Sequence, residues 1–173
     1  MRSFMNRIVT ARIGGTTNFY RDGAGAALRR SRLEAYLDSR TTATWLLVGE
    51  APGYRGARIS GLPFTSERQL TGSGPGESTA TIVHRVLAEL GLTDDVLLWN
   101  VVPTHPGTTT SNRRPTRPEI EAGRAFALEL ARGRRVVCAG RIAQAALGGV
   151  YVRHPSHGGA TVFAEMFQAA VTS

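Results

Sequence analysis

The sequence predicts an α/β fold: a three-layer α/β/α sandwich around a short four-stranded parallel sheet. Short apolar runs of strand length alternate along the chain with segments whose apolar residues recur at helical spacing, which indicates parallel strands covered by helices on both faces. The chain of 173 residues is long enough to bury the core of one such sandwich. We therefore expect a single domain over residues 1–173.

The order of the elements follows from these runs. Strands are expected at residues 45–48, 96–99, 136–139 and 150–152. Helices are expected at residues 22–38, 82–90, 116–132, 142–147 and 162–171. Thr116 and Glu119 have the spacing of a capping box, which predicts the start of the third of these helices. Residues 1–20 show no clear period and are expected to form a loosely attached arm.

Composition restricts the chemistry and the partners. The chain has 21 arginines and no lysine against 13 acidic residues, and its net charge of +8 favours a polyanionic partner such as nucleic acid. Without lysine there is no lysine nucleophile, Schiff base or Walker-type phosphate loop. Cys138 is the one cysteine, which excludes an internal disulfide and cysteine cages for zinc or iron–sulfur clusters. No apolar run approaches the roughly 20 residues of a membrane span, so we expect a cytoplasmic protein without a membrane partner.

Polar side chains follow three of the predicted strands. Glu50 comes directly after the first strand, Asn100 ends the second, and His154 follows the fourth. Because right-handed crossovers place the carboxyl ends of parallel strands at one edge of the sheet, we expect these side chains to form one site. Taken singly, each has an ordinary interpretation: a surface carboxylate, an amide in a turn and a satisfied histidine.

Three loop features leave alternatives open. Phe64 either fills the core or offers a platform for a stacked base. The glycine-rich residues 71–78 lack the lysine of a nucleotide-binding loop and are expected to form a mobile connector capped by Ser78. The basic residues 113–117 are either a solvated surface or, beside a nucleic-acid site, a clamp for phosphates.

Together, these motifs resemble those of the uracil-DNA glycosylase superfamily. Residues 49–53, Gly-Glu-Ala-Pro-Gly, are similar to its first motif in the family-four form, and residues 61–64, Gly-Leu-Pro-Phe, follow at the expected distance. The further matching segments are residues 100–102 and 112–120 (middle segment), 137–141 (strand and turn before the third helix) and 154–156 (second catalytic motif, His-Pro-Ser). The resemblance covers residues 44–157 in the family order.

The chain departs from the family pattern at three places. The cysteines that hold an iron–sulfur cluster in some members are absent, with Thr104 and Gly123 at two of their positions, which implies a cluster-free relative. Residues 54–56, Tyr-Arg-Gly, replace the acidic pair of family-four enzymes, and residues 54–65 are closer to family five. Ala51 stands where the best-known family has a catalytic aspartate, so Glu50 as the base and positioning of water by the backbone alone both stay open.

The resemblance implies a role for each group of residues. Glu50 and His154 are the expected catalytic residues: Glu50 positions water and offsets the cationic sugar, and His154 stabilises the leaving pyrimidine anion. The expected substrate pocket consists of Ala51, Pro52, Gly53, Phe64, which stacks on the base, and Asn100, which recognises its Watson–Crick edge. The expected DNA-binding residues are Arg55, Arg58, Arg113, Arg114, Arg117, Pro155, Ser156 and His157. No metal and no cofactor are expected.

We therefore expect a monofunctional DNA glycosylase of base excision repair that flips uracil out of DNA and hydrolyses its N-glycosidic bond, leaving an abasic site. The expected partner is uracil-containing DNA, single- or double-stranded, and the expected state is a cytoplasmic monomer associated with the nucleoid through DNA. Three alternatives stay open: a DNA-binding relative of the same fold with weak or no activity, a glycosylase for other deaminated bases, and an enzyme acting on free nucleotides.

Overall fold

The structure, a computed structural model, describes residues 2–172 and confirms the predicted sandwich around a short parallel sheet. The strands are β1 (Trp45–Gly49), β2 (Val96–Asn100), β3 (Arg135–Ala139) and β4 (Val150–Val152), which pair in parallel in the order β2-β1-β3-β4. The helices are α1 (Arg2–Thr10), α2 (Ala26–Ser39), α3 (Ala57–Ser60), α4 (Glu67–Thr71), α5 (Ser78–Glu89), α6 (Arg117–Ala131), α7 (Arg141–Leu147) and α8 (Ala160–Thr172). Within residues 2–172, no helix is long and apolar enough to cross a bilayer.

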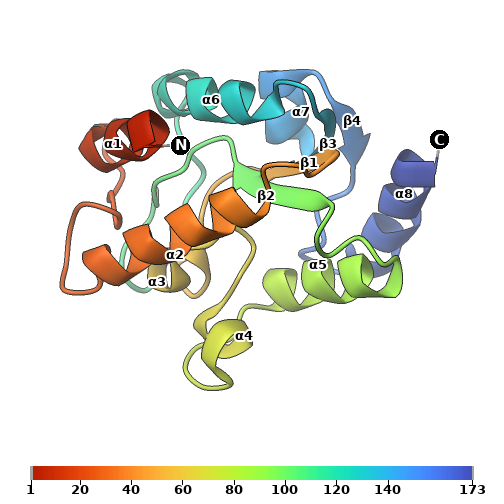
Figure 1. The fold of residues 1–173 in the computed structure, drawn as a ribbon, viewed down its shortest axis with the longest axis horizontal. Helices are drawn as coiled ribbons and strands as arrows, with labels where there is room; N and C mark the ends of the chain where they lie inside the picture. Colours follow the sequence, from red (N-terminus) through yellow and green to blue (C-terminus); the bar gives the residue numbers. More distant parts are fainter. Residues whose placement is uncertain (1, 173) are drawn as a thin grey trace.

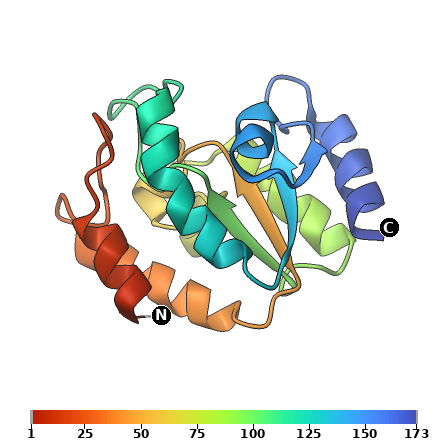
Figure 2. The same cartoon turned by 90° about the horizontal axis from the view of Figure 1, so that it is seen from above.

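Helices cover both faces of the sheet (Figure 1, Figure 2). Helices α1, α2, α6 and α7 contribute to one apolar cluster, which contains Leu46 and Val48 of β1. Helices α5 and α8 contribute to a second cluster on the other face, which contains Trp45 and Leu47. Successive side chains of a strand point to opposite faces of the sheet, and helices cover both faces. Every residue of β1 and β2 is therefore buried, as expected for a parallel sheet between helices.

The prediction of a loosely attached arm over residues 1–20 was wrong for residues 2–20, while Met1 lies outside the described residues. Helix α1 buries Phe4, Met5 and Ile8 in the first apolar cluster. The Phe4 ring packs edge-on against Trp99 of β2 and Phe126 of α6, with centroid separations of 5.7 and 5.6 Å. A helix of nine residues makes barely two and a half turns, which is too short to show a helical period in the sequence.

The connection between β1 and α5 contains more structure than its glycine and proline content indicates. It holds α3 and α4, and at the start of α4 the Gln69 side chain accepts a hydrogen bond from the Ser66 N–H at 2.8 Å. The expected cap at Ser78 is wrong: Glu77 occupies the N-cap position of α5, and its side chain makes no capping hydrogen bond. The predicted capping box at the start of α6, formed by Thr116 and Glu119, is confirmed.

Replacing Phe4 with alanine should lower the free energy of unfolding by about 3–5 kcal/mol, because it leaves a cavity between α1, β2 and α6. Urea denaturation followed by circular dichroism measures the change. Leu28 on α2 is 54% exposed, so the control variant Leu28→Ala should stay within about 0.5 kcal/mol of the wild type. Equal urea midpoints for the two variants would mean that α1 is not part of the core.

Candidate active site

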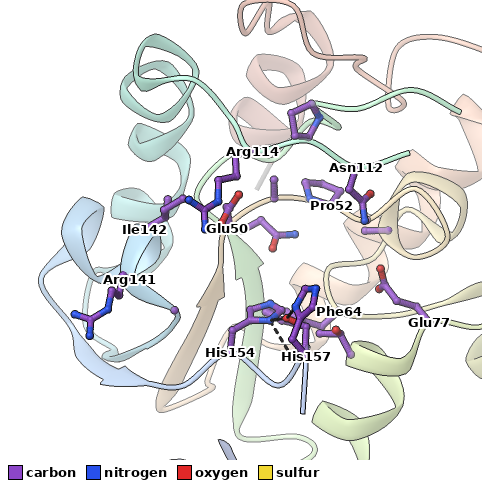
Figure 3. Close-up of a pocket in the computed structure, with 18 of the residues that line it drawn as sticks. Glu50, Pro52, Phe64, Glu77, Asn112, Arg114, Arg141, Ile142, His154 and His157 are labelled. Carbon is purple, nitrogen blue, oxygen red and sulfur yellow. Dashed lines mark hydrogen bonds between the residues drawn. The ribbon is translucent and has the colours of Figure 1, made fainter. Parts of the chain in front are cut away.

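A cavity of about 720 Å³ opens at the carboxyl edge of the sheet (Figure 3). Glu50, which follows β1, Asn100, at the end of β2, and His154, which follows β4, all line this cavity. The register accounts for part of this arrangement, because Gly49 and Asn100 are paired and the Val101 N–H donates to the Gly49 carbonyl at 2.9 Å. The structure thus brings together the three polar residues that the sequence places at strand ends.

Phe64 and Asn100 meet over Gly49, the last residue of β1. A Cβ atom at Gly49 would overlap the tip of the Phe64 ring and lie 2.9 Å from Oδ1 of Asn100, so a larger residue does not fit there. Phe64 packs in the second apolar cluster, as the core-filling interpretation predicts, and its side also lines the cavity. Asn100 is only 5% exposed, and its amide makes no hydrogen bond to another described residue. The amide is therefore available to a ligand in the cavity.

The loop that carries Phe64 is strained and firmly held. Phe64 has a φ of 51°, in the left-handed region that residues other than glycine seldom adopt. Two side chains hold the loop: the Ser60 hydroxyl donates to the Thr65 carbonyl at 2.6 Å, and the Tyr20 hydroxyl donates to the Gly61 carbonyl at 2.9 Å. Burial raises the pKa of Tyr20, which keeps this hydroxyl protonated as a donor. Strain of this kind, maintained by surrounding contacts, is typical of functional sites.

The contacts of His154 favour a ring that carries its proton on Nε2. The Ser156 N–H donates to Nδ1 of His154 at 3.2 Å, so Nδ1 is the unprotonated nitrogen. The Ser156 hydroxyl lies 2.8 Å from the same nitrogen and 3.0 Å from Nδ1 of His157, which links the three side chains (Figure 3). Burial, and to a smaller extent His157, lowers the pKa of His154, which favours the neutral ring. The site therefore holds an N–H donor that keeps its proton without carrying a charge.

Glu50 is a partly buried carboxylate on the wall of the cavity, near Arg114 (Figure 3). Burial raises the pKa of Glu50, and the Arg114 guanidinium opposes this shift. The backbone at this position is fixed because the Glu50 carbonyl accepts from the Val102 N–H at 3.1 Å. A carboxylate whose pKa is raised by burial is a stronger base than a solvated one and is suited to accept a proton from water.

Two polar side chains that the sequence analysis missed tie the cavity loops together. Oδ1 of Asn112 accepts from the Tyr54 N–H at 2.9 Å. The buried ring of His105 lies 2.8 Å from the carbonyl oxygens of both Pro52 and Thr108. The ring therefore bridges the first-motif loop at Pro52 and the loop at Thr108. Asn112 belongs to the matching segment 112–120, but no local pattern gives it or His105 this holding role, because the loops that they hold are 58 and 53 residues away in the sequence.

A third missed residue is Glu77, which lines the cavity from the N-terminal end of α5.

Cys138 and His84 do not line the cavity and make contacts within the fold. Cys138 is buried in the first apolar cluster, and burial raises the pKa of its thiol. His84 lies 3.0 Å from the Thr65 hydroxyl, below the Phe64 loop. In the part of the chain that the structure describes, no group of three or more His, Cys, Asp or Glu side chains is arranged to hold a metal ion.

Sequence and structure comparisons agree with this architecture. A sequence model of the Uracil DNA glycosylase superfamily matches residues 38–170. The chain belongs to the uracil DNA glycosylase superfamily. The resemblance inferred from the motifs is thereby confirmed.

Two solved structures are similar to this superfamily member over almost its whole length. SMUG2 from Pedobacter heparinus has a TM-score of 0.65 and 15% sequence identity, covering 98% of this chain and 99% of that chain. UNG from Nitratifractor salsuginis has a TM-score of 0.46 and 16% identity, covering 98% of this chain and 95% of that chain. No curated protein sequence matches the chain. At 15% identity, the similarity to SMUG2 shows a shared fold.

Most of the residues expected to bind the substrate and DNA line the cavity, but some of the DNA-binding candidates lie outside it. Those that line the cavity with Glu50 and His154 are Ala51, Pro52, Gly53, Phe64, Asn100, Arg113, Arg114, Ser156 and His157. Arg55 and Arg58 line a neighbouring cavity of about 570 Å³, whereas Arg117 and Pro155 lie outside the first cavity. The residues expected from the sequence therefore make up about half of the wall of one cavity, and two further arginines line the neighbouring one.

Arg113 has a structural partner that the sequence analysis did not foresee. Its guanidinium donates two hydrogen bonds to Glu119, at 2.8 and 2.7 Å. Glu119 is 2% exposed and also accepts from the N–H groups of Thr116 at 2.8 Å and Gly15 at 3.1 Å. The hydrogen bond from Arg113 is the main reason that the pKa of Glu119 is lowered to about 2. Arg113 thus fastens its loop to α6 and the N-terminal segment, which leaves Arg114 as the freer cation.

Replacing Glu119 with glutamine should flatten the pH dependence of stability in acid. Because the pKa of Glu119 falls from 4.5 to about 2 on folding, the ionised carboxylate stabilises the fold above pH 4.5. This contribution is lost as the pH drops from about 4.5 to about 2. The free energy of unfolding of the wild type should therefore fall more steeply over that window than that of Glu119→Gln.

Denaturant titrations at a series of pH values measure both curves. Glu121→Gln, an exposed position on the same helix, is the charge-matched control. Parallel curves for wild type and Glu119→Gln would contradict the assigned role of Glu119.

Proposed function

We propose that this member of the superfamily is a DNA glycosylase that flips uracil out of DNA and hydrolyses its N-glycosidic bond, leaving an abasic site. The observation that carries the proposal is the neutral Nε2–H of His154 in the same cavity as the Phe64 ring and the unpaired Asn100 amide. A flat heterocycle with one polar edge and a carbonyl that gains negative charge needs these three groups. Uracil is such a heterocycle.

Base recognition is assigned to Phe64 and Asn100. The flipped base stacks on the Phe64 ring. The Asn100 amide then offers an acceptor to the N3–H of uracil and a donor to its O4. Cytosine presents the opposite pattern, an acceptor at N3 and a donor at N4, so an amide bound in this orientation disfavours it. Because Phe64 and Asn100 converge over Gly49, the stacking and the hydrogen bonds act on one ring.

His154 is assigned to the leaving group. When the bond between C1′ and N1 breaks, its electron pair stays on the base as a uracil anion, and O2 carries part of the charge. The Nε2–H donates to O2 and stabilises this anion more than the neutral base, which lowers the barrier. Ser156 and His157 act as positioning residues, because their contacts keep Nδ1 as the acceptor.

Glu50 is assigned to the water. Its carboxylate orients a water molecule towards C1′, offsets the positive charge of the sugar, and takes one proton as the water oxygen bonds to C1′. Ala51 carries no polar side chain, so Glu50 is the carboxylate that the first motif supplies. The chain has no lysine for a Schiff base with the sugar, which supports simple hydrolysis over strand cleavage. Arg114 at the rim is assigned to a phosphate of the uracil-containing strand.

Purified protein should release uracil from DNA and leave alkali-labile abasic sites, with a chelator present. Replacing His154 with alanine should lower the single-turnover rate by roughly 10²–10³, the effect of losing one donor to a developing oxyanion. DNA affinity of this variant should be unchanged, which separates chemistry from binding. Failure of the folded wild type to release uracil at any enzyme excess would overturn the proposal and leave a DNA-binding relative as the alternative.

Asn100→Asp should lose activity on uracil and gain measurable activity on cytosine, because a carboxylate repels O4 and accepts from an exocyclic amine. Product analysis on oligonucleotides that differ only in the target base measures the ratio. Asn112→Asp adds the same charge to the same cavity, where its oxygen still accepts from the Tyr54 N–H, and is the matched control. Equal uracil rates for the wild type and Asn100→Asp would remove Asn100 from base recognition.

A further inference from the structure

Glu77 places a second carboxylate in the active-site cavity, across from His154 (Figure 3). It reaches the cavity over two glycines of the loop after β1. A Cβ atom on Gly53 or on Gly56 would overlap the Glu77 carboxylate, so this group occupies the space that side chains at those positions would take. Gly53 also lines the cavity, which puts the carboxylate beside the wall of the proposed base pocket.

No partner within the protein explains this carboxylate. Among residues 2–172, no hydrogen bond or ion pair reaches it, and it does not cap α5. Burial alone raises the pKa of Glu77. Arg58, which lines the neighbouring cavity with Glu77, instead donates to the carbonyls of Tyr54 and Thr109, both at 3.1 Å. A partly buried carboxylate without a partner is costly to the folded protein, which points to a role towards a ligand.

The geometry of the pyrimidine ring determines which atom of the bound base faces Glu77. This step rests on the proposed function, in which O2 points to His154 and the N3–O4 edge points to Asn100. C5 lies opposite C2 in the six-membered ring, so its substituent points away from His154. Glu77 and His154 stand on opposite sides of the cavity in Figure 3, and the Glu77 carboxylate lies against Gly53. In the proposed binding mode, C5 therefore points towards Glu77.

Selection at C5 is chemically necessary for such an enzyme. Thymine is 5-methyluracil and presents the same O2, N3–H and O4 atoms, so neither His154 nor Asn100 distinguishes it from uracil. Only a group near C5 can do so. A methyl group pressed against a carboxylate removes water from it and returns no hydrogen bond, whereas a hydroxyl on the same carbon donates one.

We infer that Glu77 is the specificity-determining residue for position 5 of the base: its carboxylate disfavours a methyl group, tolerates hydrogen and accepts a hydrogen bond from a donor such as hydroxymethyl. Gly53 and Gly56 provide the space that this carboxylate needs. A contact with the bound base also explains why the Glu77 carboxylate is partly buried without a partner within the protein.

The test compares Glu77→Ala with the wild type on three duplexes that carry uracil, thymine or 5-hydroxymethyluracil opposite guanine. Single-turnover rates give two ratios, thymine to uracil and 5-hydroxymethyluracil to uracil. In Glu77→Ala the first ratio should rise and the second should fall, each by about tenfold or more, the scale of one charge-assisted hydrogen bond. Glu77→Gln, which keeps an acceptor oxygen, should retain the 5-hydroxymethyluracil ratio within about threefold.

Two further variants keep the test decisive. Gly56 does not line the active-site cavity, so the methyl group of Gly56→Ala reaches the base only by displacing Glu77, and the variant should shift both ratios in the direction of Glu77→Ala. Glu34→Ala, at an exposed position on α2, removes the same charge and should change neither ratio. If Glu77→Ala does not fold, judged by its urea midpoint, Gly56→Ala and Glu77→Gln carry the comparison.

The outcomes separate this inference from the proposed function. Uracil release by the wild type with both ratios unchanged in the Glu77 and Gly56 variants would overturn the role of Glu77 alone. No uracil release by the folded wild type would overturn the proposed function, and the role of Glu77 would fall with it. Opposite shifts of the two ratios in Glu77→Ala, with no shift in Glu34→Ala, would establish the role of Glu77 at position 5 of the base.

Discussion

A side chain at Gly49 would collide with the Phe64 ring and crowd the Asn100 amide, and the geometry of the whole site depends on this restriction. The parallel register pairs Gly49 with Asn100, so the amide necessarily stands beside the end of β1. Phe64 then reaches the same point from the loop that follows. The pairing of β1 with β2 fixes the position of the Asn100 amide. The absence of a side chain at Gly49 leaves the space that the Phe64 ring occupies.

The loops around this point are held by polar side chains that end on backbone groups. Tyr20 and Ser60 fasten the strained Phe64 loop, and His105 fastens the first motif at Pro52. Each of these side chains is buried, where an unmade hydrogen bond costs more than a made one returns. The loops are therefore determined as strongly as the sheet, although they contain little regular structure. Such rigidity keeps Phe64, Asn100 and His154 in fixed positions on the wall of one cavity.

The electrostatic arrangement inside the cavity differs from that of the surface. The chain carries a net charge of +8, yet the partly buried groups of the cavity include the carboxylates of Glu50 and Glu77 and the neutral ring of His154. Burial raises the pKa of both carboxylates and lowers that of His154, so the low-dielectric environment moves each group towards its neutral form. The surface of the chain is therefore predominantly cationic, while burial favours uncharged forms of the groups inside the cavity.

The sequence by itself determined the sheet, most of the helices that cover it, and the three polar strand ends, because periodicity and strand direction are local properties. Glu50, Asn100 and His154 were found for that reason. Helix α1 was missed because its stability comes from Trp99 and Phe126, which follow it by about 100 residues. Glu77, His105 and the pairing of Arg113 with Glu119 were missed because burial and partners arise only when distant loops pack together. Local patterns determine which side chains stand at the ends of the strands, whereas long-range packing determines the distances between these side chains and their charge states.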